Sequence, residues 1–111
     1  LLGIPWSECA QVGVLLGKKT VLNEFIAYLD LKAILENGSP MVGGMLEART
    51  VAISTYALCG FANIGSVAIQ IGGIGALAPN RQGDLARLGV RALAAGTLAN
   101  LANAAIAGIL L

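Results

Sequence analysis

One uncharged stretch decides the fold of this chain: residues 54–79, STYALCGFANIGSVAIQIGGIGALAP. The uncharged run around it extends from Thr50 to Asn80, which is 31 residues without Asp, Glu, Lys or Arg. An unbroken helix of that length would span about 46 Å, whereas the hydrocarbon core of a bilayer is about 30 Å thick. The run is therefore long enough to cross a membrane and too long for one straight crossing.

The middle of this stretch is polar and rich in small residues. Gly60, Asn63, Gly65 and Ser66 all fall within the segment GFANIGS. Glycine costs about 1 kcal/mol relative to alanine inside a helix, and Asn and Ser compete for backbone hydrogen bonds. We therefore expect a discontinuous helix over residues 48–78, whose freed backbone groups can bind a solute. The alternative is helix packing: the two glycines fit both interpretations equally, whereas Asn63 and Ser66 together favour a binding site.

A second uncharged run, from Ala92 to Leu111, contains 20 residues and fits a single membrane crossing. We place the final spanning helix at residues 88–111 and a loop at residues 79–87. Around this loop, the segment APNRQGDLARLGVR contains three Arg and one Asp. The positive-inside rule therefore puts the loop in the cytoplasm.

Small residues recur at a spacing of four in the final helix. Ala95, Ala99 and Asn103 form one such stripe, and Ala104 and Gly108 form another. Stripes of this kind let neighbouring helices approach closely, and asparagines bridge them. We therefore expect this helix, with its two asparagines at 100 and 103, to pack against other helices rather than to bind a ligand.

The composition supports a membrane environment for the whole chain. Hydrophobic residues make up 57% and charged residues 12%, against about 25% charged in an ordinary soluble domain. A soluble domain of this size would need a more polar surface. The net charge of +1, with no basic stripe, argues against nucleic acid as a partner. We predict an all-α integral membrane protein.

No catalytic or metal centre is predicted, and no cofactor. The chain has no His, and Cys9 and Cys59 lie 50 positions apart, so we expect two buried thiols rather than zinc ligands. No Ser or Cys nucleophile has a recognisable base, which leaves an enzyme of the membrane poorly supported. Because the chain begins and ends in mid-pattern, we expect it to be a piece of a longer protein.

The first 40 residues contain charges too closely spaced for a full crossing. Two short helices over residues 10–36, meeting near Gly17–Thr20, would form a re-entrant hairpin, which is tolerated where protein or a water-filled cavity surrounds it. An interfacial amphipathic helix is an equally good interpretation of the residues alone. The loop that follows, residues 37–47, is indicated by the Asn-Gly, Ser-Pro and Gly-Gly pairs of LENGSPMVGG. Residues 1–9 would be the end of a preceding helix or a loop.

Glu24 is the carboxylate that this hairpin would carry into the membrane. It follows Asn23 in GKKTVLNEFIAYLDL, residues 17–31. An ionised group at that depth usually faces a protein interior or a cavity and marks a pathway. Its oxygens can accept strong, charge-assisted hydrogen bonds from the hydroxyls of a solute. The alternative is a structural salt bridge to Lys18 or Lys19.

Two long segments carry a family resemblance. GKKTVLNEFIAY, residues 17–28, resembles the G-x-K-x-x-x-N-E-F-V-A-Y signature of concentrative nucleoside transporters, with Ile26 in place of the more usual Val. Residues 60–101 are similar to the portion that follows in bacterial members. The resemblance covers the chain from about residue 10 to its end, and the two segments occur in the right order.

The resemblance implies the C-terminal part of a cation-coupled nucleoside symporter that works by alternating access. It implies a multi-pass protein of the cell membrane, the inner membrane in a Gram-negative bacterium, and a homotrimer in full length. By motif, Glu24, Asn63 and Ser66 would contact the ribose and Phe61 would lie beside the nucleoside. Asn23 would either contact solute or support the hairpin tip. The coupling cation, Na+ or H+, would bind outside this segment.

One other class fits the same residues. A small helical membrane subunit or channel would use Asn63 and Ser66 only to pack its helices. Such a subunit would have no further spans upstream, whereas a transporter requires several and a second polar-tipped hairpin. We take the transporter as the main interpretation.

Overall fold

The computed structural model describes residues 2–111, so residue 1 of the expected leading segment lies outside the described residues. The predicted all-helical fold is confirmed. The elements are α1 (Trp6–Val21), α2 (Glu24–Asn37), α3 (Ala48–Leu58), α4 (Ile64–Leu77), the 3-10 turn η1 (Pro79–Arg81) and α5 (Gln82–Leu110).

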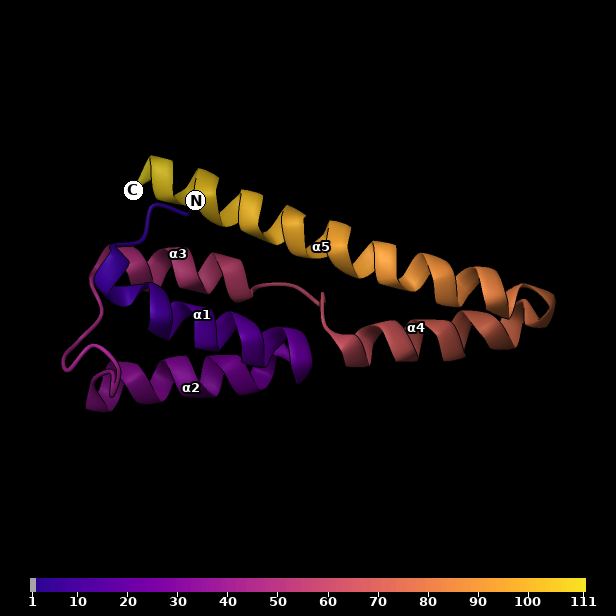
Figure 1. The fold of residues 1–111 in the computed structure, drawn as a ribbon, viewed down its shortest axis with the longest axis horizontal. Helices are drawn as coiled ribbons and strands as arrows, with labels where there is room; N and C mark the ends of the chain where they lie inside the picture. The colour runs from indigo at the N-terminus through magenta and orange to yellow at the C-terminus, as the bar shows by residue number, and fades with distance from the viewer. Residues whose placement is uncertain (1) are drawn as a thin grey trace.

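The helices form an elongated body with α5 as its spine. Figure 1 shows α3 and α4 following each other along α5, with the hairpin of α1 and α2 beside α3 and its tip at the start of α4. The body measures 52 × 27 × 17 Å. The long uncharged stretch therefore forms two helices, separated by residues 59–63, and each of them packs on a different half of α5.

The hairpin turns later than the sequence predicted. We expected the two helices to meet near Gly17–Thr20, but α1 continues through these residues to Val21. The turn lies at Leu22 and Asn23 because the amide of Leu22 still donates to the carbonyl of Lys18 (2.8 Å), while the side chain of Asn23 begins the next helix. The two glycines inside α1, Gly13 and Gly17, are tolerated since each costs only about 1 kcal/mol.

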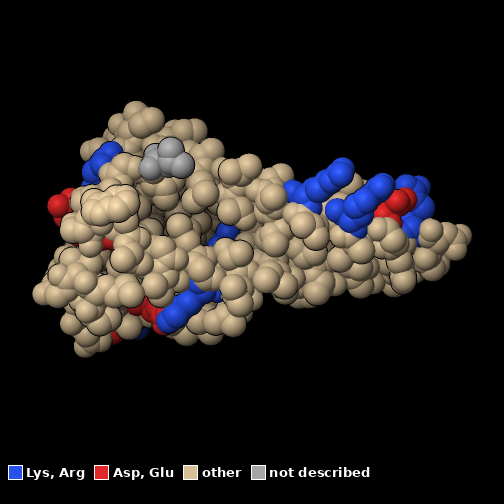
Figure 2. Space-filling view, viewed as in Figure 1, with Lys and Arg blue, Asp and Glu red and all other residues tan. Residues whose placement is uncertain are grey.

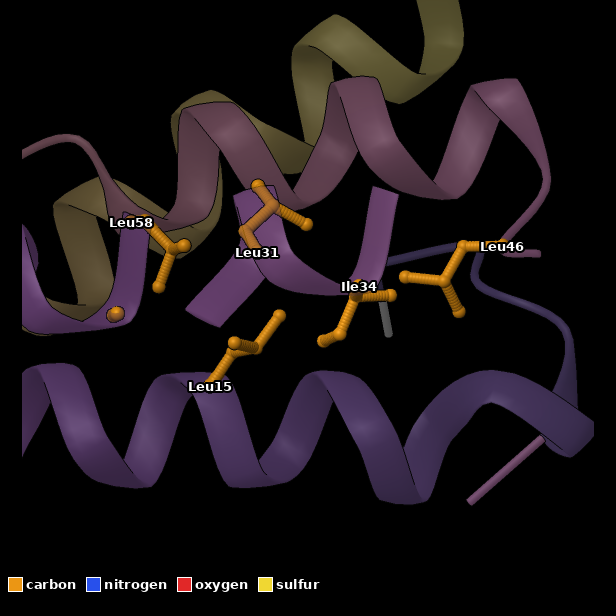
Figure 3. Packing of buried hydrophobic residues seen from close by; sticks show 6 residues of the cluster. Leu15, Leu31, Ile34, Leu46 and Leu58 are labelled. Carbon is orange, nitrogen blue, oxygen red and sulfur yellow. The ribbon is translucent and has the colours of Figure 1, made fainter. Parts of the chain in front are cut away.

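A hydrophobic core joins α1, α2 and α3. Its six members come from the three helices and from the loop before α3, and each is at most 6% exposed (Figure 3): Leu15, Ala27, Leu31, Ile34, Leu46 and Leu58. Two polar contacts, one buried and one partly buried, connect the loop after α2 to α1. Ser39 Oγ donates to Gln11 Oε1 (2.7 Å), and the amide of Glu47 donates to Glu8 Oε1 (2.9 Å). The hairpin therefore packs on α3, and hydrogen bonds connect α1 to the loop that leads into α3.

A second small core joins α3 to α5. Ile53 and Ala57 of α3 pack on Ala104, and Gly108 lies so close to Ile53 that a Cβ built on it would come within 3.0 Å. The predicted Ala104–Gly108 stripe is therefore a contact within this chain. The other predicted stripe, with Ala95 and Ala99, is exposed.

The connection into α5 is shorter than expected. We predicted a loop over residues 79–87, but only η1 separates α4 from α5, which begins at Gln82. Asp84 lies in the first turn of α5, accepts from Arg81 Nε (2.7 Å) and pairs with Arg87 Nη2 (3.6 Å). A carboxylate at a helix N-terminus and ion pairs at this spacing both favour helix.

One helix in the described part of the chain, Pro79–Leu110 with its 3-10 start, is long and apolar enough to cross a membrane. The helix Ile64–Leu77 is apolar and shorter. Only 11% of the most apolar window of the long helix is buried within this chain. Its remaining surface is therefore available to lipid or to further protein.

Candidate functional site

The start of α2 is set by Asn23. Its backbone is extended (φ −165°), and its side-chain Oδ1 accepts a hydrogen bond from the amide of Ile26 (2.9 Å). Asn is among the best residues for this N-cap position because its oxygen satisfies an amide that has no partner inside the helix. Glu24 is thereby held as the first residue of α2, half-buried at the hairpin tip.

The start of α4 repeats this arrangement. Asn63 is also extended (φ −141°), and its Oδ1 accepts from the amide of Ser66 (2.7 Å). In contrast to the exposed Asn23, Asn63 is buried, at 3% exposed. Its Oδ1 is used by the cap, so its Nδ2 is left to donate elsewhere.

The two helix starts meet through these side chains. Asn63 Nδ2 donates to Glu24 Oε2 across 3.1 Å, which joins residues 39 positions apart in the sequence. A hydrogen bond to a carboxylate is about twice as strong as one between neutral groups. Of the predicted site residues, Glu24 and Asn63 are therefore in direct contact.

Phe61 and Ser66 lie on a neighbouring groove. Phe61 is 79% exposed and Ser66 is half-buried. The groove has a volume of about 500 Å³, and its lining is mostly apolar side chains of α4 and α5. Its lining residues are Phe61, Ala62, Ser66, Val67, Gln70, Ile71, Ile74, Leu85, Leu88, Gly89, Ala92, Leu93, Gly96 and Asn100. Glu24 is not among them, so the predicted residues form a pair at the hairpin tip and a pair on this groove.

The salt-bridge alternative for Glu24 is wrong for both lysines. Lys18 Nζ pairs with Asp30 Oδ2 in α2 instead. Lys19 forms no salt bridge in residues 2–111, and Glu24 forms none there either. Its Oε1 has no hydrogen-bond donor within the same residues. One carboxylate oxygen is thus left to accept from another molecule.

A polar contact beside the hairpin tip is not predicted by the sequence. Lys19 is buried at 2% exposed, and its Nζ lies 3.0 Å from the side-chain oxygen of Asn100, whose nitrogen donates to the carbonyl of Cys59 (3.1 Å). The amide of Asn100 takes this orientation because its oxygen then faces a donor, the Lys19 ammonium, and its nitrogen faces an acceptor, the Cys59 carbonyl. The pair Lys18–Lys19 carries no signal for which ammonium is buried, since that depends on the fold. The prediction of two buried thiols is wrong: Cys9 is half-buried, and Cys59 is exposed because it follows α3 in residues 59–63, the non-helical chain break between α3 and α4.

No metal centre is formed by the described part of the chain. Within residues 2–111, no three His, Cys, Asp or Glu side chains lie close enough together to hold an ion. What the hairpin tip and the chain break offer instead is one half-buried carboxylate, one buried amide and backbone at two helix starts. Such groups bind hydroxyls and other neutral polar groups.

Comparison with known proteins gives one consistent match. Residues 1–108 match the family model described as Na+ dependent nucleoside transporter C-terminus. An uncharacterized transporter of Bacillus subtilis, YutK, is 50% identical over 109 residues. The putative nucleoside permease NupX of Escherichia coli is 47% identical over 108 residues. These alignments cover 98% and 97% of this chain, and the chain spans 25% of each relative's length.

Solved structures give the same match. A structure of CNTnw in an inward-facing substrate-bound state superimposes with a TM-score of 0.85 at 48% identity. A CNTnw variant in an outward-facing state also gives a TM-score of 0.85, at 47% identity. Each covers 96% of this chain and is matched over 25% of its own length.

Proposed function

Because this chain belongs to the family of Na+-dependent nucleoside transporters, a family of multi-pass membrane symporters rather than enzymes, we propose that it supplies ribose contacts for nucleoside import. The imported nucleoside would be carried by alternating access, with a cation gradient as the driving force. The coupling cation would be held outside residues 1–111, and the full-length protein would be a homotrimer in the cell membrane, the inner membrane in a Gram-negative bacterium.

The observation that carries this proposal is the hydrogen bond between Asn63 and Glu24. It joins the hairpin tip to the chain break and leaves Glu24 Oε1 without a donor in the described residues. A vicinal diol such as that of ribose offers two hydroxyls to a carboxylate, and such bonds are charge-assisted. Ser66 and Phe61, on the next groove, would contact the same nucleoside.

The order and lengths of the helices support the following membrane topology. Residues 10–36 are a re-entrant hairpin, residues 48–78 are a discontinuous membrane-crossing helix, and residues 88–111 belong to the final span. Neither α3 nor α4 spans alone, since 14 residues of helix are about 21 Å long. Figure 2 shows Lys and Arg gathered where α4 meets α5, and Arg81 and Arg87 there are exposed. This end would face the cytoplasm.

The equal likeness to two transport states supports movement as one unit. A TM-score of 0.85 to both an inward-facing and an outward-facing structure is expected if this part keeps its internal arrangement while it moves. Alternating access is largely rigid-body movement of one bundle against another. Glu24 and Asn63 would therefore stay together through the transport cycle.

The test is uptake of radiolabelled uridine by the full-length protein under a Na+ gradient. We expect Glu24→Gln and Asn63→Ala to lose uptake while their amount in the membrane is preserved. Two matched controls come from exposed positions of the same residue types: Glu36→Gln in α2 and Asn103→Ala in α5. Normal uptake in both site variants would overturn the site, and absence of gradient-dependent nucleoside uptake by the wild type would overturn the function.

A further inference from the structure

The two adjacent lysines of the hairpin have opposite environments. Lys18 is at the surface, with 44% of its side chain exposed and Asp30 as its partner. Lys19 is 2% exposed and is the largest fully buried side chain in the described residues. Burying an ammonium without partners is costly, and a lysine near a surface normally extends its amine into water. The burial of Lys19 therefore needs an explanation from the groups around it.

The groups around Lys19 come from three separate elements. Asn100 of α5 presents its side-chain oxygen to Lys19 Nζ (3.0 Å) and, through its nitrogen, holds the carbonyl of Cys59 at the end of α3 (3.1 Å). Glu24 of α2 interacts with the ammonium electrostatically without forming a direct ion pair. Lys19 thus links the hairpin to the chain break by way of α5.

The chain break is shaped to make this link possible. Gly60 has φ of +151°, a conformation that side chains rarely adopt, and a Cβ built on it would lie 2.5 Å from the side-chain amide group of Asn100. Only glycine lets the backbone after Cys59 approach Asn100 so closely. The next polar residue along the chain is Asn63, which returns to Glu24. Lys19 of the hairpin therefore contacts Asn100 of α5, which contacts the carbonyl of Cys59 at the chain break. Asn63, at the other end of the break, contacts Glu24 of the hairpin.

We propose that Lys19 is a positioning residue for nucleoside binding: its bond to Asn100 holds the hairpin tip against the chain break, so that Glu24 stays in contact with Asn63. This role rests on the proposed ribose site. Lys19 would not touch the nucleoside. Because Lys19 forms no direct ion pair with Glu24, both carboxylate oxygens are left to Asn63 and the substrate.

The test uses the full-length transporter and two readouts, the KM for uridine uptake and the Kd for uridine binding to purified protein. Lys19→Met keeps the length and removes the charge, and Asn100→Leu removes the partner. We expect each to raise KM and Kd by about tenfold, the size of one hydrogen bond to a charged group. Lys18→Met is the matched control and should stay within about twofold, because exposed pairs contribute little. Lys19→Arg should restore part of the affinity.

The double variant Lys19→Met with Asn100→Leu separates positioning from general damage. If both side chains act through one bond, their effects are not additive, and the double variant should bind uridine about as weakly as either single variant. Additive losses, or a lowered maximal rate with unchanged KM and Kd, would overturn the positioning role. If Lys19→Met fails to reach the membrane, Asn100→Leu and Lys19→Arg decide the question by the same readouts.

The measurements distinguish failure of the role proposed for Lys19 from failure of the proposed ribose site. Wild-type affinity in Lys19→Met together with lost uptake in Glu24→Gln would overturn the role of Lys19 alone. Normal uptake in both Glu24→Gln and Asn63→Ala would overturn the ribose site on which it rests.

Discussion

The helices α2 and α4 begin with the same kind of N-cap, but the two capping asparagines differ in exposure and in their further contacts. Each begins with an extended Asn whose side-chain oxygen accepts from the amide three residues later, Asn23 from Ile26 and Asn63 from Ser66. Asn23 is exposed and does nothing further within the described residues, whereas Asn63 is 3% exposed and also donates to Glu24.

This difference separates a local role from a tertiary one. A cap needs only the oxygen of the side chain, and Asp supplies that oxygen as well as Asn does. The contact with Glu24 needs the nitrogen, which Asp lacks. Replacing each Asn by Asp therefore keeps both caps and removes the one interaction that distinguishes the two positions.

The largest effect is expected from Asn63→Asp. The variant keeps the cap of α4 but places a second carboxylate against Glu24 and removes a bond to a charged group. We expect uridine uptake efficiency to fall by about a hundredfold. Asn23→Asp should stay close to the wild type in the same assay. Equal losses in the two variants would mean that the nitrogen of Asn63 has no special role.

Gly60→Ala should have the next largest effect, on stability. Its conformation at φ of +151° costs about 1–3 kcal/mol for a side chain, and the added Cβ meets Asn100. Gly72 in α4 is a matched control, because nothing lies within 4 Å of a Cβ there and alanine favours helix by about 1 kcal/mol. Thermal unfolding of purified full-length protein measures both. A midpoint in Gly60→Ala at or above that of Gly72→Ala would contradict the close approach.

A smaller effect is expected from Asn23→Ala, which removes only a cap. Loss of a cap costs about 1 kcal/mol, so the first turn of α2 should open more often. Hydrogen exchange of the peptide that covers this turn should be faster in Asn23→Ala than in Asn23→Asp. Unchanged exchange would show that the hairpin tip is held by other contacts.

The smallest effect belongs to the surface pair of Lys18 and Asp30. An exposed ion pair contributes at most about 1 kcal/mol, so Asp30→Asn should leave the thermal midpoint of the full-length protein nearly unchanged. A large loss of stability would mean that this pair is covered in the full-length protein.

Much of the fold follows from residues that act locally. Gly60, Asn63 and Ser66 indicate an interruption because they weaken helix and favour caps, and the chain does leave the helix at residues 59–63. The predicted turn near Gly17–Thr20 is too early, because α1 continues to Val21 and Asn23 is the residue that starts α2. A cap is the stronger signal, since it satisfies amides that a glycine leaves free.

The tertiary contacts of the site are harder to predict. Nothing in the order Lys18–Lys19 says that the second lysine is buried, because its partner Asn100 lies 81 positions away in α5. Asn100 was predicted to bridge helices, which agrees with its contacts, but the identity of the bridged groups depends on how α5 packs along the chain break. The family resemblance supplied Glu24 and Asn63 as a pair, and their role as ribose contacts stays a prediction.

The most direct test of the central claim compares two ligands in two proteins. The Kd values of uridine and 2′,3′-dideoxyuridine are measured for the full-length wild type and for Glu24→Gln. If Glu24 accepts from ribose hydroxyls, the wild type should prefer uridine by about a hundredfold, and Glu24→Gln should reduce that preference to less than about tenfold. The same preference in both proteins would contradict a ribose contact at Glu24.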